Sequence, residues 1–266
     1  MNPLPEIPTL DSTEKPRGSS PTSPGLLRKT ALEAYSLWAS TYDSDPNPLL
    51  ALEERELSPC LSDLRGKRVV DVGCGTGRWL RKCLQRGAQD PVGVDLSAEM
   101  LAHAAHKSSL RGRILRGDCL ALPLRDGIAD LVVCSFLAGY VADLGTLGRE
   151  LGRISKSNAD IYVTDFHPQS RTGGWRRTFR HGDQVVEVST VDYGEEQIVA
   201  AFGAEGLKLC RSRTAYLGEQ ERAFFHQRGR AQLFDAARKI PAVLLCHFKA
   251  IGNYSKGDRA VAETEA

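Results

Sequence analysis

The chain has 266 residues, of which 41% are hydrophobic and 26% are charged, and its formal net charge at pH 7 is +2. This length and composition fit one globular α/β domain with appendages, or two small domains at most. The small net charge excludes a strongly basic nucleic-acid-binding surface over the whole protein, although it is compatible with a local basic patch.

Seven cysteines are scattered along the chain without a Cys-X-X-Cys pair, which predicts reduced thiols and no structural zinc site. His103 and His106 have a helical spacing that suits a metal ligand pair, but no carboxylate or thiolate accompanies them. We therefore interpret them as surface residues and expect no metal. The N-terminus lacks the apolar core of a signal peptide, and no apolar run reaches the roughly 18 residues of a membrane span. These features predict a soluble, cytoplasmic protein.

Six of the thirteen prolines fall within residues 1–27, together with many serines and threonines. Such a segment buries too little apolar surface to order itself, and we predict a disordered tail there. We expect one domain over residues 28–253, followed by a second flexible tail over residues 254–266.

The domain is expected to begin with a helical cover over residues 30–58. Thr30 and Glu33 fit a capping box at the start of its first helix. One face of that helix then carries three aromatic side chains, Tyr35, Trp38 and Tyr42. The prolines that follow break the helix, and a second helix is expected over residues 49–56.

From residue 67 onward the apolar pattern alternates between short strands and amphipathic helices. We predict strands over residues 67–72, 91–96, 113–117, 129–136 and 159–166, with helices among them over residues 76–87, 97–108 and 143–155. Repeated strand–helix units with apolar strands indicate a parallel sheet that is covered by helices on both faces.

The later part of the chain departs from this alternation. Residues 167–193 are polar and rich in arginine, with a candidate hairpin over residues 178–190. We expect them to form an insertion that lies over the strand ends as a lid. The remaining pattern predicts a helix over residues 194–206, a strand over 207–218, a helical stretch over 219–238 and a last strand over 241–252.

Three polar or glycine-rich stretches fall at predicted strand ends, where open α/β sheets bind ligands. They are residues 71–77, Asp95 and residues 117–119. In the first stretch, Arg78 stands where a dinucleotide-binding loop has its third glycine. Asp71 would also bring negative charge close to a pyrophosphate. Both features disfavour NAD and favour a ligand with positive charge, such as a sulfonium or an α-ammonium group.

The other two stretches fit the remaining parts of such a ligand. Asp95 lies 18 residues after Gly77 and can accept hydrogen bonds from both hydroxyls of a ribose. Asp118 can accept a hydrogen bond from the exocyclic amine of adenine. Sites for a positive charge, a ribose and an adenine in chain order describe S-adenosylmethionine.

Three runs of this chain are VVDVGCGTGRWL, VGVDLSAEML and RGDCLALPLRDGIADLVVCSF. In this order they resemble the successive signature motifs of class I S-adenosylmethionine-dependent methyltransferases. The resemblance covers roughly residues 30–165. The run AYSLWASTYDSDPNP is also similar to the N-terminal helix of the subgroup that methylates quinone precursors and acyl-carrier substrates. The resemblance implies a Rossmann-like, doubly wound sheet of seven strands, mostly parallel with an antiparallel last strand, and helices on both faces.

The same resemblance implies cofactor contacts at the positions that match the family motifs. They are Tyr35, Asp71, Gly73, Cys74, Gly75, Asp95, Leu96, Met100, Asp118, Cys119, Cys134 and Ser135. The acidic and glycine residues of the first motif would hold the methionine part, Asp95 the ribose and Asp118 the adenine. Residues 134–136 would pass under the sulfonium.

The run after the fourth predicted strand departs from the family pattern. Many relatives have a histidine there, whereas residues 135–140 read Ser-Phe-Leu-Ala-Gly-Tyr. Tyr140 is a candidate catalytic residue because it could fill part of that space. His167 is a second candidate, because it follows a strand end from which a general base could reach a substrate. A purely structural role for His167 is equally compatible with the sequence.

The leading interpretation is transfer of a methyl group to a small-molecule acceptor, by an in-line displacement that the protein promotes through positioning and exclusion of water. Whether the acceptor atom is O, C, N or S stays open. Candidate acceptor contacts are Trp38, Tyr42, Phe136, Trp175 and Arg180. The arginine-rich run over residues 171–181 predicts either a solvated lid or a dock for an anionic or carrier-bound acceptor.

Other functions stay open on the sequence alone. An RNA or other nucleic-acid methyltransferase could use the arginine run. The sequence has neither an Asn-Pro-Pro-Tyr-like run after the fourth strand nor a Pro-Cys nucleophile, which disfavours that function. A cofactor-binding module without transfer activity is another alternative, and an NAD-dependent oxidoreductase ranks last. No stripe of residues predicts an oligomeric interface.

Overall fold

A computed structural model describes residues 26–251. The tail predicted over residues 254–266 lies outside the described residues, and so does the predicted N-terminal tail up to residue 25. Strand β1 (Leu26–Lys29) pairs in parallel with β8 (Gln184–Val188). Within the described residues, regular structure is therefore already present at Leu26, four residues before the predicted helix cap, because this segment pairs with a strand far away in the sequence.

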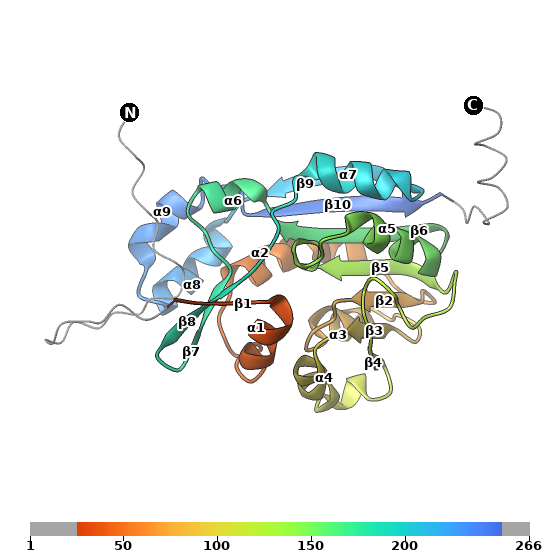
Figure 1. Cartoon of the computed structure of the whole chain (residues 1–266), viewed down its shortest axis with the longest axis horizontal. Helices are drawn as coiled ribbons and strands as arrows, with labels where there is room; N and C mark the ends of the chain where they lie inside the picture. The colour runs from red at the N-terminus through yellow and green to blue at the C-terminus, as the bar shows by residue number, and fades with distance from the viewer. Residues whose placement is uncertain (1–25, 252–266) are drawn as a thin grey trace, which may run out of the picture.

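Within the described residues, seven strands form the main sheet in the order β4-β3-β2-β5-β6-β10-β9 (Figure 1). Their bounds are β2 Val69–Val72, β3 Val92–Asp95, β4 Ile114–Arg116, β5 Ala129–Ser135, β6 Ser155–Phe166, β9 Leu207–Ala215 and β10 Val243–Ala250. Strands β2 to β6 pair in parallel, whereas β10 runs antiparallel to both β6 and β9. The prediction of a mostly parallel seven-stranded sheet with an antiparallel last strand is confirmed.

Helices surround this sheet. They are α1 Ala31–Trp38, α2 Pro48–Leu57, α3 Arg78–Gln85, α4 Ala98–Ala105, α5 Leu144–Ile154, α6 Pro168–Thr172, α7 Glu195–Ala204, α8 Arg222–Gln227 and α9 Phe234–Ala237. The capping box of Thr30 and Glu33 forms as predicted. Asn47 caps α2 in the same manner, because its side-chain oxygen accepts from the backbone N–H of Leu49 at 2.9 Å. The helical stretch predicted over residues 219–238 is instead broken into short helices, with Gly229 at φ +67° between them.

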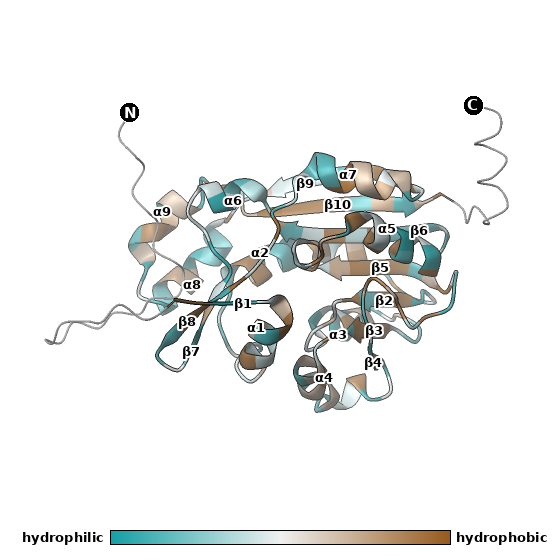
Figure 2. Ribbon diagram, viewed as in Figure 1, coloured by the Kyte–Doolittle hydropathy of each residue, from teal (hydrophilic) through white to brown (hydrophobic). Residues whose placement is uncertain are grey.

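Helices cover both faces of the sheet because successive residues of a strand point to opposite sides. In β5, Val132 and Cys134 pack in one cluster with α5 and α7. Leu131 and Val133 pack in another cluster with α2 and α3. Figure 2 shows the hydrophobic residues along β5 and β10 in the middle of these layers. The part of the chain that the structure describes contains no helix that is both long and apolar enough to cross a bilayer.

A smaller sheet of three strands joins the N-terminal segment to the insertion. Its order is β1-β8-β7, with β7 spanning Thr178–His181. The predicted hairpin forms, because β7 and β8 pair antiparallel around Gly182, whose φ is +58°. Helix α1 packs on this sheet, where the rings of Trp38 and Phe179 stack with centroids 4.6 Å apart. The helical cover and the insertion therefore form one packed unit, which Figure 1 shows around β1, β7, β8 and α1.

Candidate active site

A cavity of ≈ 330 Å³ lies where β2, β3 and β5 end. Most residues that the sequence predicts as cofactor contacts line it, namely Tyr35, Asp71, Gly73, Cys74, Gly75, Asp95, Leu96, Met100, Asp118, Cys119 and Ser135. Cys134 does not line this cavity. Its side chain is fully buried in the cluster between the sheet and α5, because the alternation along β5 turns Ser135 toward the cavity and Cys134 away from it.

The loop between β2 and α3 depends on glycine at three positions. Gly73, Gly75 and Gly77 have φ values of 73°, 53° and 80°, in the left-handed region that side chains disfavour. At Gly77, an added Cβ would lie 2.3 Å from Cδ1 of Leu110. The loop backbone can therefore approach a ligand in the cavity closely, and it is held in that conformation by packing beneath it.

Asp95 ends β3 and is fixed by two backbone amides. Its Oδ2 accepts from the N–H of Gly75 at 2.7 Å, and its Oδ1 accepts from the N–H of Ser97 at 2.8 Å. Burial raises its pKa, and these hydrogen bonds oppose that effect. Each carboxylate oxygen keeps a second lone pair, so both oxygens could still accept a hydroxyl of a ribose.

Asp71 is 1% exposed and faces the same cavity. Its Oδ2 accepts from the N–H of Leu80 at 3.1 Å, whereas its Oδ1 has no partner in the described part of the chain. Burial raises the pKa of Asp71 to about 7, and the nearby guanidinium of Arg78 is the main opposing influence. A buried carboxylate oxygen without a partner costs free energy that a cationic ligand would recover. The residues present therefore fit the α-ammonium group of S-adenosylmethionine.

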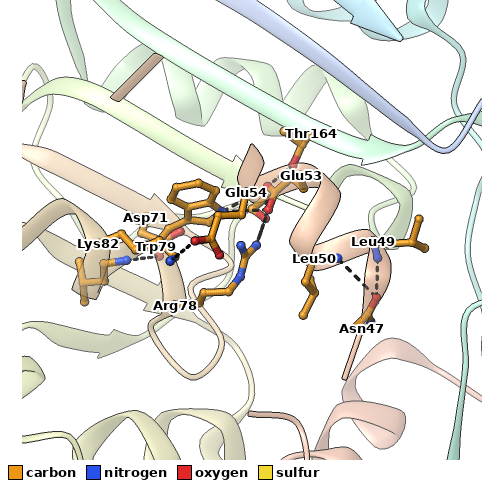
Figure 3. A network of polar contacts seen from close by, with 12 residues as sticks. Asn47, Leu49, Leu50, Glu53, Glu54, Asp71, Arg78, Trp79, Lys82 and Thr164 are labelled. Atoms are coloured by element: carbon orange, nitrogen blue, oxygen red, sulfur yellow. Dashed lines mark hydrogen bonds and ion pairs between the residues drawn. The ribbon is translucent and has the colours of Figure 1, made fainter. Parts of the chain in front are cut away.

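A buried carboxylate from α2 connects this cavity to the core. Glu53 is fully buried and accepts hydrogen bonds from Arg78, from Trp79 Nε1 at 3.1 Å, and from the hydroxyls of Ser135 and Thr164, each at 2.7 Å. Figure 3 shows Glu53 and Arg78 pointing toward one another from α2 and the start of α3. Four donors on one carboxylate hold α2 against the loop that lines the cavity.

Neither Glu53 nor Arg78 is among the predicted site residues, although the sequence contains a pattern that marks Glu53 as a buried carboxylate. Leu49, Leu52 and Leu57 are buried on one face of α2, and Glu53 lies on that same face. A carboxylate on the apolar stripe of a helix must find buried partners, because an unpaired buried charge is very costly.

A smaller cavity of ≈ 60 Å³ adjoins the first one. Four aromatic residues line both cavities, namely Tyr35, Tyr42, Phe136 and Tyr140. Trp38 and Thr178 line only the smaller cavity, together with Phe166 and Arg177. Within residues 26–251, neither Trp38 Nε1 nor Thr178 Oγ1 has a hydrogen-bond partner, although both atoms are buried.

Tyr140 lies at the junction of the two cavities and is held from two sides. Its hydroxyl oxygen is 2.8 Å from that of Tyr35. The guanidinium carbon of Arg177 lies 4.6 Å from the centroid of the Tyr140 ring, at a distance typical of a cation–π contact. Arg177 is fixed in turn by a buried ion pair with Asp165.

Phe136 follows β5 and also lines both cavities, with an unusual backbone conformation. Its φ of 52° lies in the left-handed region, which costs about 1–3 kcal/mol for a residue other than glycine. Its N–H donates to the carbonyl of Thr164 at 2.8 Å, and its carbonyl accepts from Arg177 at 3.4 Å. These bonds hold the strained residue between the two cavities.

Besides Cys134, three predicted site residues line neither cavity. His167 caps α6, where its Nδ1 accepts from the N–H of Gln169 at 3.3 Å. Trp175 is buried in an apolar cluster under α2. Arg180 lies on β7. The strand-end position of His167 is as predicted, but its side chain turns to the helix that follows rather than to the cavities.

The arginine-rich run is largely neutralised by acids. Arg171 pairs with Asp192 at 3.2 Å, and Arg177 pairs with Asp165. The Nε of Arg176 lies 3.8 Å from a carboxylate oxygen of Glu187. These pairs tie the insertion together, so the run is a structural part of the cover more than a surface of unpaired positive charge.

Comparisons with known proteins agree with this geometry. Residues 69–168 match a protein family described as "Methyltransferase domain". A demethylmenaquinone methyltransferase of Thermus thermophilus is 35% identical over 106 residues, which are 38% of this chain and 48% of that protein. A malonyl-[acyl-carrier protein] O-methyltransferase of Pectobacterium atrosepticum is 37% identical over 96 residues, which are 36% of this chain and 37% of that protein. The chain spans half or less of the length of these curated relatives.

Solved structures show the same fold. An S-adenosylmethionine-dependent methyltransferase from Mesorhizobium loti is 21% identical and superimposes with a TM-score of 0.60, over 76% of this chain and 100% of that one. Geranyl diphosphate C-methyltransferase from Streptomyces coelicolor is 14% identical, with a TM-score of 0.56 over 76% of this chain and 79% of that one. Residues 69–168 therefore match a methyltransferase domain, and the sheet order and the cavity at the strand ends are those of the class I S-adenosylmethionine-dependent methyltransferase fold.

Proposed function

We propose that the chain transfers a methyl group from S-adenosylmethionine to a small-molecule acceptor. One observation carries this proposal. Within the described residues, four buried side-chain nitrogen or oxygen atoms lack a hydrogen-bond partner, and all four belong to residues that line the two adjoining cavities. Each such atom costs about 1–3 kcal/mol when it is left unsatisfied. Two neighbouring ligands would satisfy all four atoms.

The unpartnered atoms of the larger cavity are charged, which supports the cofactor there. They are Oδ1 of Asp71 and Nη1 of Arg78. Asp71 would hold the ammonium group, Asp95 the ribose hydroxyls, and Met100 would pack beside the adenosine. When bound, the cofactor supplies a methyl group that its positively charged sulfur activates for transfer.

The unpartnered atoms of the smaller cavity are neutral donors, the indole N–H of Trp38 and the hydroxyl of Thr178. Six aromatic side chains line this cavity, Tyr35, Trp38, Tyr42, Phe136, Tyr140 and Phe166. Aromatic walls with two donors favour a planar acceptor that carries an oxygen. The relative named as a demethylmenaquinone methyltransferase is in accord with a planar acceptor.

Tyr140 is the residue that we assign to the acceptor, because it reaches both cavities. Its hydroxyl would orient an acceptor oxygen toward the methyl group, and Tyr35 would keep that hydroxyl in place through the 2.8 Å contact. Methyl transfer needs little more than this alignment in a site without water. His167 is not part of this proposal, because it lines neither cavity.

The proposal is tested first by calorimetric titration of the full chain with S-adenosylmethionine and, separately, with NAD. We expect micromolar binding of S-adenosylmethionine alone, and its loss in Asp95→Ala. Asp183→Ala is the matched control, since Asp183 lies in the exposed turn between β7 and β8. Equal binding by Asp95→Ala and the wild type would contradict the assignment of the cavity.

The acceptor is tested by release of S-adenosylhomocysteine with three classes of compound, hydroxylated planar rings, carrier-bound acids and RNA. We expect turnover with planar rings. Turnover with RNA alone, lost as salt concentration rises, would favour the nucleic-acid function instead. Tight cofactor binding without turnover in any class would favour a binding module without transfer activity.

A further inference from the structure

Acidic side chains outnumber basic side chains around the larger cavity. Asp71, Asp95 and Asp118 line it, and Arg78 is the only cationic side chain among the described residues that do so. S-adenosylmethionine carries positive charge on its sulfur and its ammonium group, and one negative charge on its α-carboxylate. The acids suit the positive groups and the ribose, which leaves Arg78 as the cation for the carboxylate.

The guanidinium of Arg78 is anchored through one of its two terminal nitrogens. Nη2 pairs with Glu53 and donates to Oγ of Ser135 at 3.2 Å. The guanidinium carbon lies 4.9 Å from the centroid of the Trp79 ring. Nη1 is buried and has no partner among the described residues. One arm of the guanidinium is therefore fixed, while the other arm of this cavity-lining residue keeps unsatisfied N–H donors.

We propose that Nη1 of Arg78 binds the α-carboxylate of S-adenosylmethionine and that Glu53 is the positioning residue that makes this possible. The inference rests on the proposed cofactor site and extends it to the negatively charged group of the ligand. A guanidinium and a carboxylate form short, charge-assisted hydrogen bonds of well-defined direction. Arg78 thus selects ligands that keep the amino-acid carboxylate.

Glu53 is needed because Asp71 lies close to Arg78. The guanidinium is the main influence that lowers the pKa of Asp71, so the two side chains already attract one another. Without a stronger partner, Arg78 would turn to Asp71 and neutralise the carboxylate that receives the ammonium group. Glu53 prevents this, since it is fully buried and is itself held by the hydroxyls of Ser135 and Thr164.

The competing explanation is that Arg78 only balances the charge of Glu53. The two explanations differ in what happens to the preference for a carboxylate on the ligand. If Arg78 is only a counter-ion, its removal weakens all adenosine ligands alike. If it binds the carboxylate, its removal weakens S-adenosylmethionine but leaves decarboxylated S-adenosylmethionine almost unaffected.

The experiment measures the dissociation constants of these two ligands by calorimetry and takes their ratio for each protein. The test variant is the double substitution Glu53→Gln with Arg78→Met, which removes both charges so that neither is left buried alone. Glu53→Gln by itself tests the positioning role, because it keeps the guanidinium but removes the carboxylate that holds it. Circular dichroism and thermal unfolding establish that each variant is folded, and Arg78→Lys serves as a second variant that keeps the ion pair with Glu53.

We expect the wild type to prefer S-adenosylmethionine by about tenfold or more, as for a hydrogen bond between charged groups. Glu53→Gln and Arg78→Lys should each reduce this preference severalfold, and the double variant should bind both ligands within about twofold. A Glu53→Gln variant that keeps the full preference overturns the positioning role of Glu53. A double variant that keeps the full preference, or a wild type that binds both ligands equally, overturns the role of Arg78. Failure of the wild type to bind either ligand instead overturns the proposed cofactor site itself.

Discussion

Tyr35 and Tyr140 place their hydroxyl oxygens 2.8 Å apart, although the two residues are 105 positions apart in the chain. Tyr35 comes from the N-terminal helix α1, and Tyr140 comes from the segment that follows β5. Their rings meet edge to face, with centroids 5.5 Å apart. The contact closes the boundary between the two cavities and brings a hydroxyl to the place where the proposed cofactor and acceptor would meet.

Replacement of Tyr140 by Phe should slow methyl transfer by about tenfold to hundredfold, because an orienting or proton-accepting hydroxyl is lost at the junction. Affinity for S-adenosylmethionine should change by less than about threefold, since a hydrogen bond of this kind contributes little to binding outside the reacting centre. The measurements are turnover at saturating substrate and calorimetry. Tyr216→Phe, at a residue that is 46% exposed, should match the wild type in both. Unchanged turnover in Tyr140→Phe would remove Tyr140 from the reaction.

Replacement of Glu53 by Ala should lower the free energy of unfolding by about 3–5 kcal/mol, because Arg78, Trp79, Ser135 and Thr164 together lose the carboxylate that accepts their hydrogen bonds. The neighbouring residue provides the control. Glu54 pairs with Lys82 at the surface, where its side chain is 41% exposed, and Glu54→Ala should cost about 0–1 kcal/mol. Urea unfolding followed by circular dichroism measures both values. Equal costs for the two variants would contradict the buried ion pair.

The pKa of about 7 for Asp71 predicts how affinity depends on pH. In the free protein this carboxyl is largely protonated below pH 7, whereas an ammonium ligand favours its charged form. The dissociation constant of S-adenosylmethionine should therefore rise about tenfold for each pH unit below 7, and binding near pH 7 should release a proton. Calorimetry between pH 5.5 and 8, in buffers of different ionisation enthalpy, measures both effects. A flat profile in the wild type would contradict this assignment.

The same pKa predicts the direction of a stability change. Because the folded-state pKa of Asp71 is raised above its ordinary value of 3.8, the folded protein keeps a proton that the unfolded chain releases. The contribution of Asp71 to the free energy of unfolding is therefore greatest below about pH 4. This contribution falls by up to about 4 kcal/mol as pH rises through 7. Asp71→Asn should abolish this fall, as measured by urea unfolding of the ligand-free protein at several pH values.

Two glycines with nearly the same backbone conformation should lose different amounts of stability when each is replaced by Ala. Gly77 and Gly112 have φ values of +80° and +72°, but an added Cβ would meet Leu110 at Gly77 and open space at Gly112. Gly112→Ala should cost about 1–2 kcal/mol from backbone strain. Gly77→Ala should cost about 2–4 kcal/mol and weaken cofactor binding, because either the buried Leu110 side chain or the loop must also shift. Thermal unfolding and calorimetry compare the two variants, and equal losses would contradict the packing beneath the loop.

Features that follow from local periodicity could be predicted from the sequence. The strands that end at Asp71, Asp95 and Ser135 have apolar patterns that indicate a parallel sheet, and parallel strands bring their ends to one edge. This is why most predicted cofactor contacts share one cavity. Cys134 and Ser135 are successive residues of β5 and therefore face opposite sides of the sheet. The periodicity alone does not show which of the two faces the cavity, because the register of the strand is not known from the sequence.

Features that depend on contacts between distant segments could not be predicted. Glu53 and Arg78 are 25 positions apart, and their pairing depends on how α2 lies against the loop after β2. The strand β1 depends on β8, whose partner residues are more than 150 positions away. The sequence predicts the position of His167 after a strand end, but the direction of its side chain depends on the cap that it forms for α6.

The pairing of β1 with β8 also bears on how this protein can be re-engineered. Much of the wall around the proposed acceptor comes from two stretches of chain that are remote in sequence but share one small sheet and one aromatic stack between Trp38 and Phe179. A graft that exchanged only the N-terminal helix, or only the insertion, would leave strand edges and aromatic faces without their counterparts. Acceptor preference should therefore be transferable between relatives only when both stretches are transplanted together, as a single cassette.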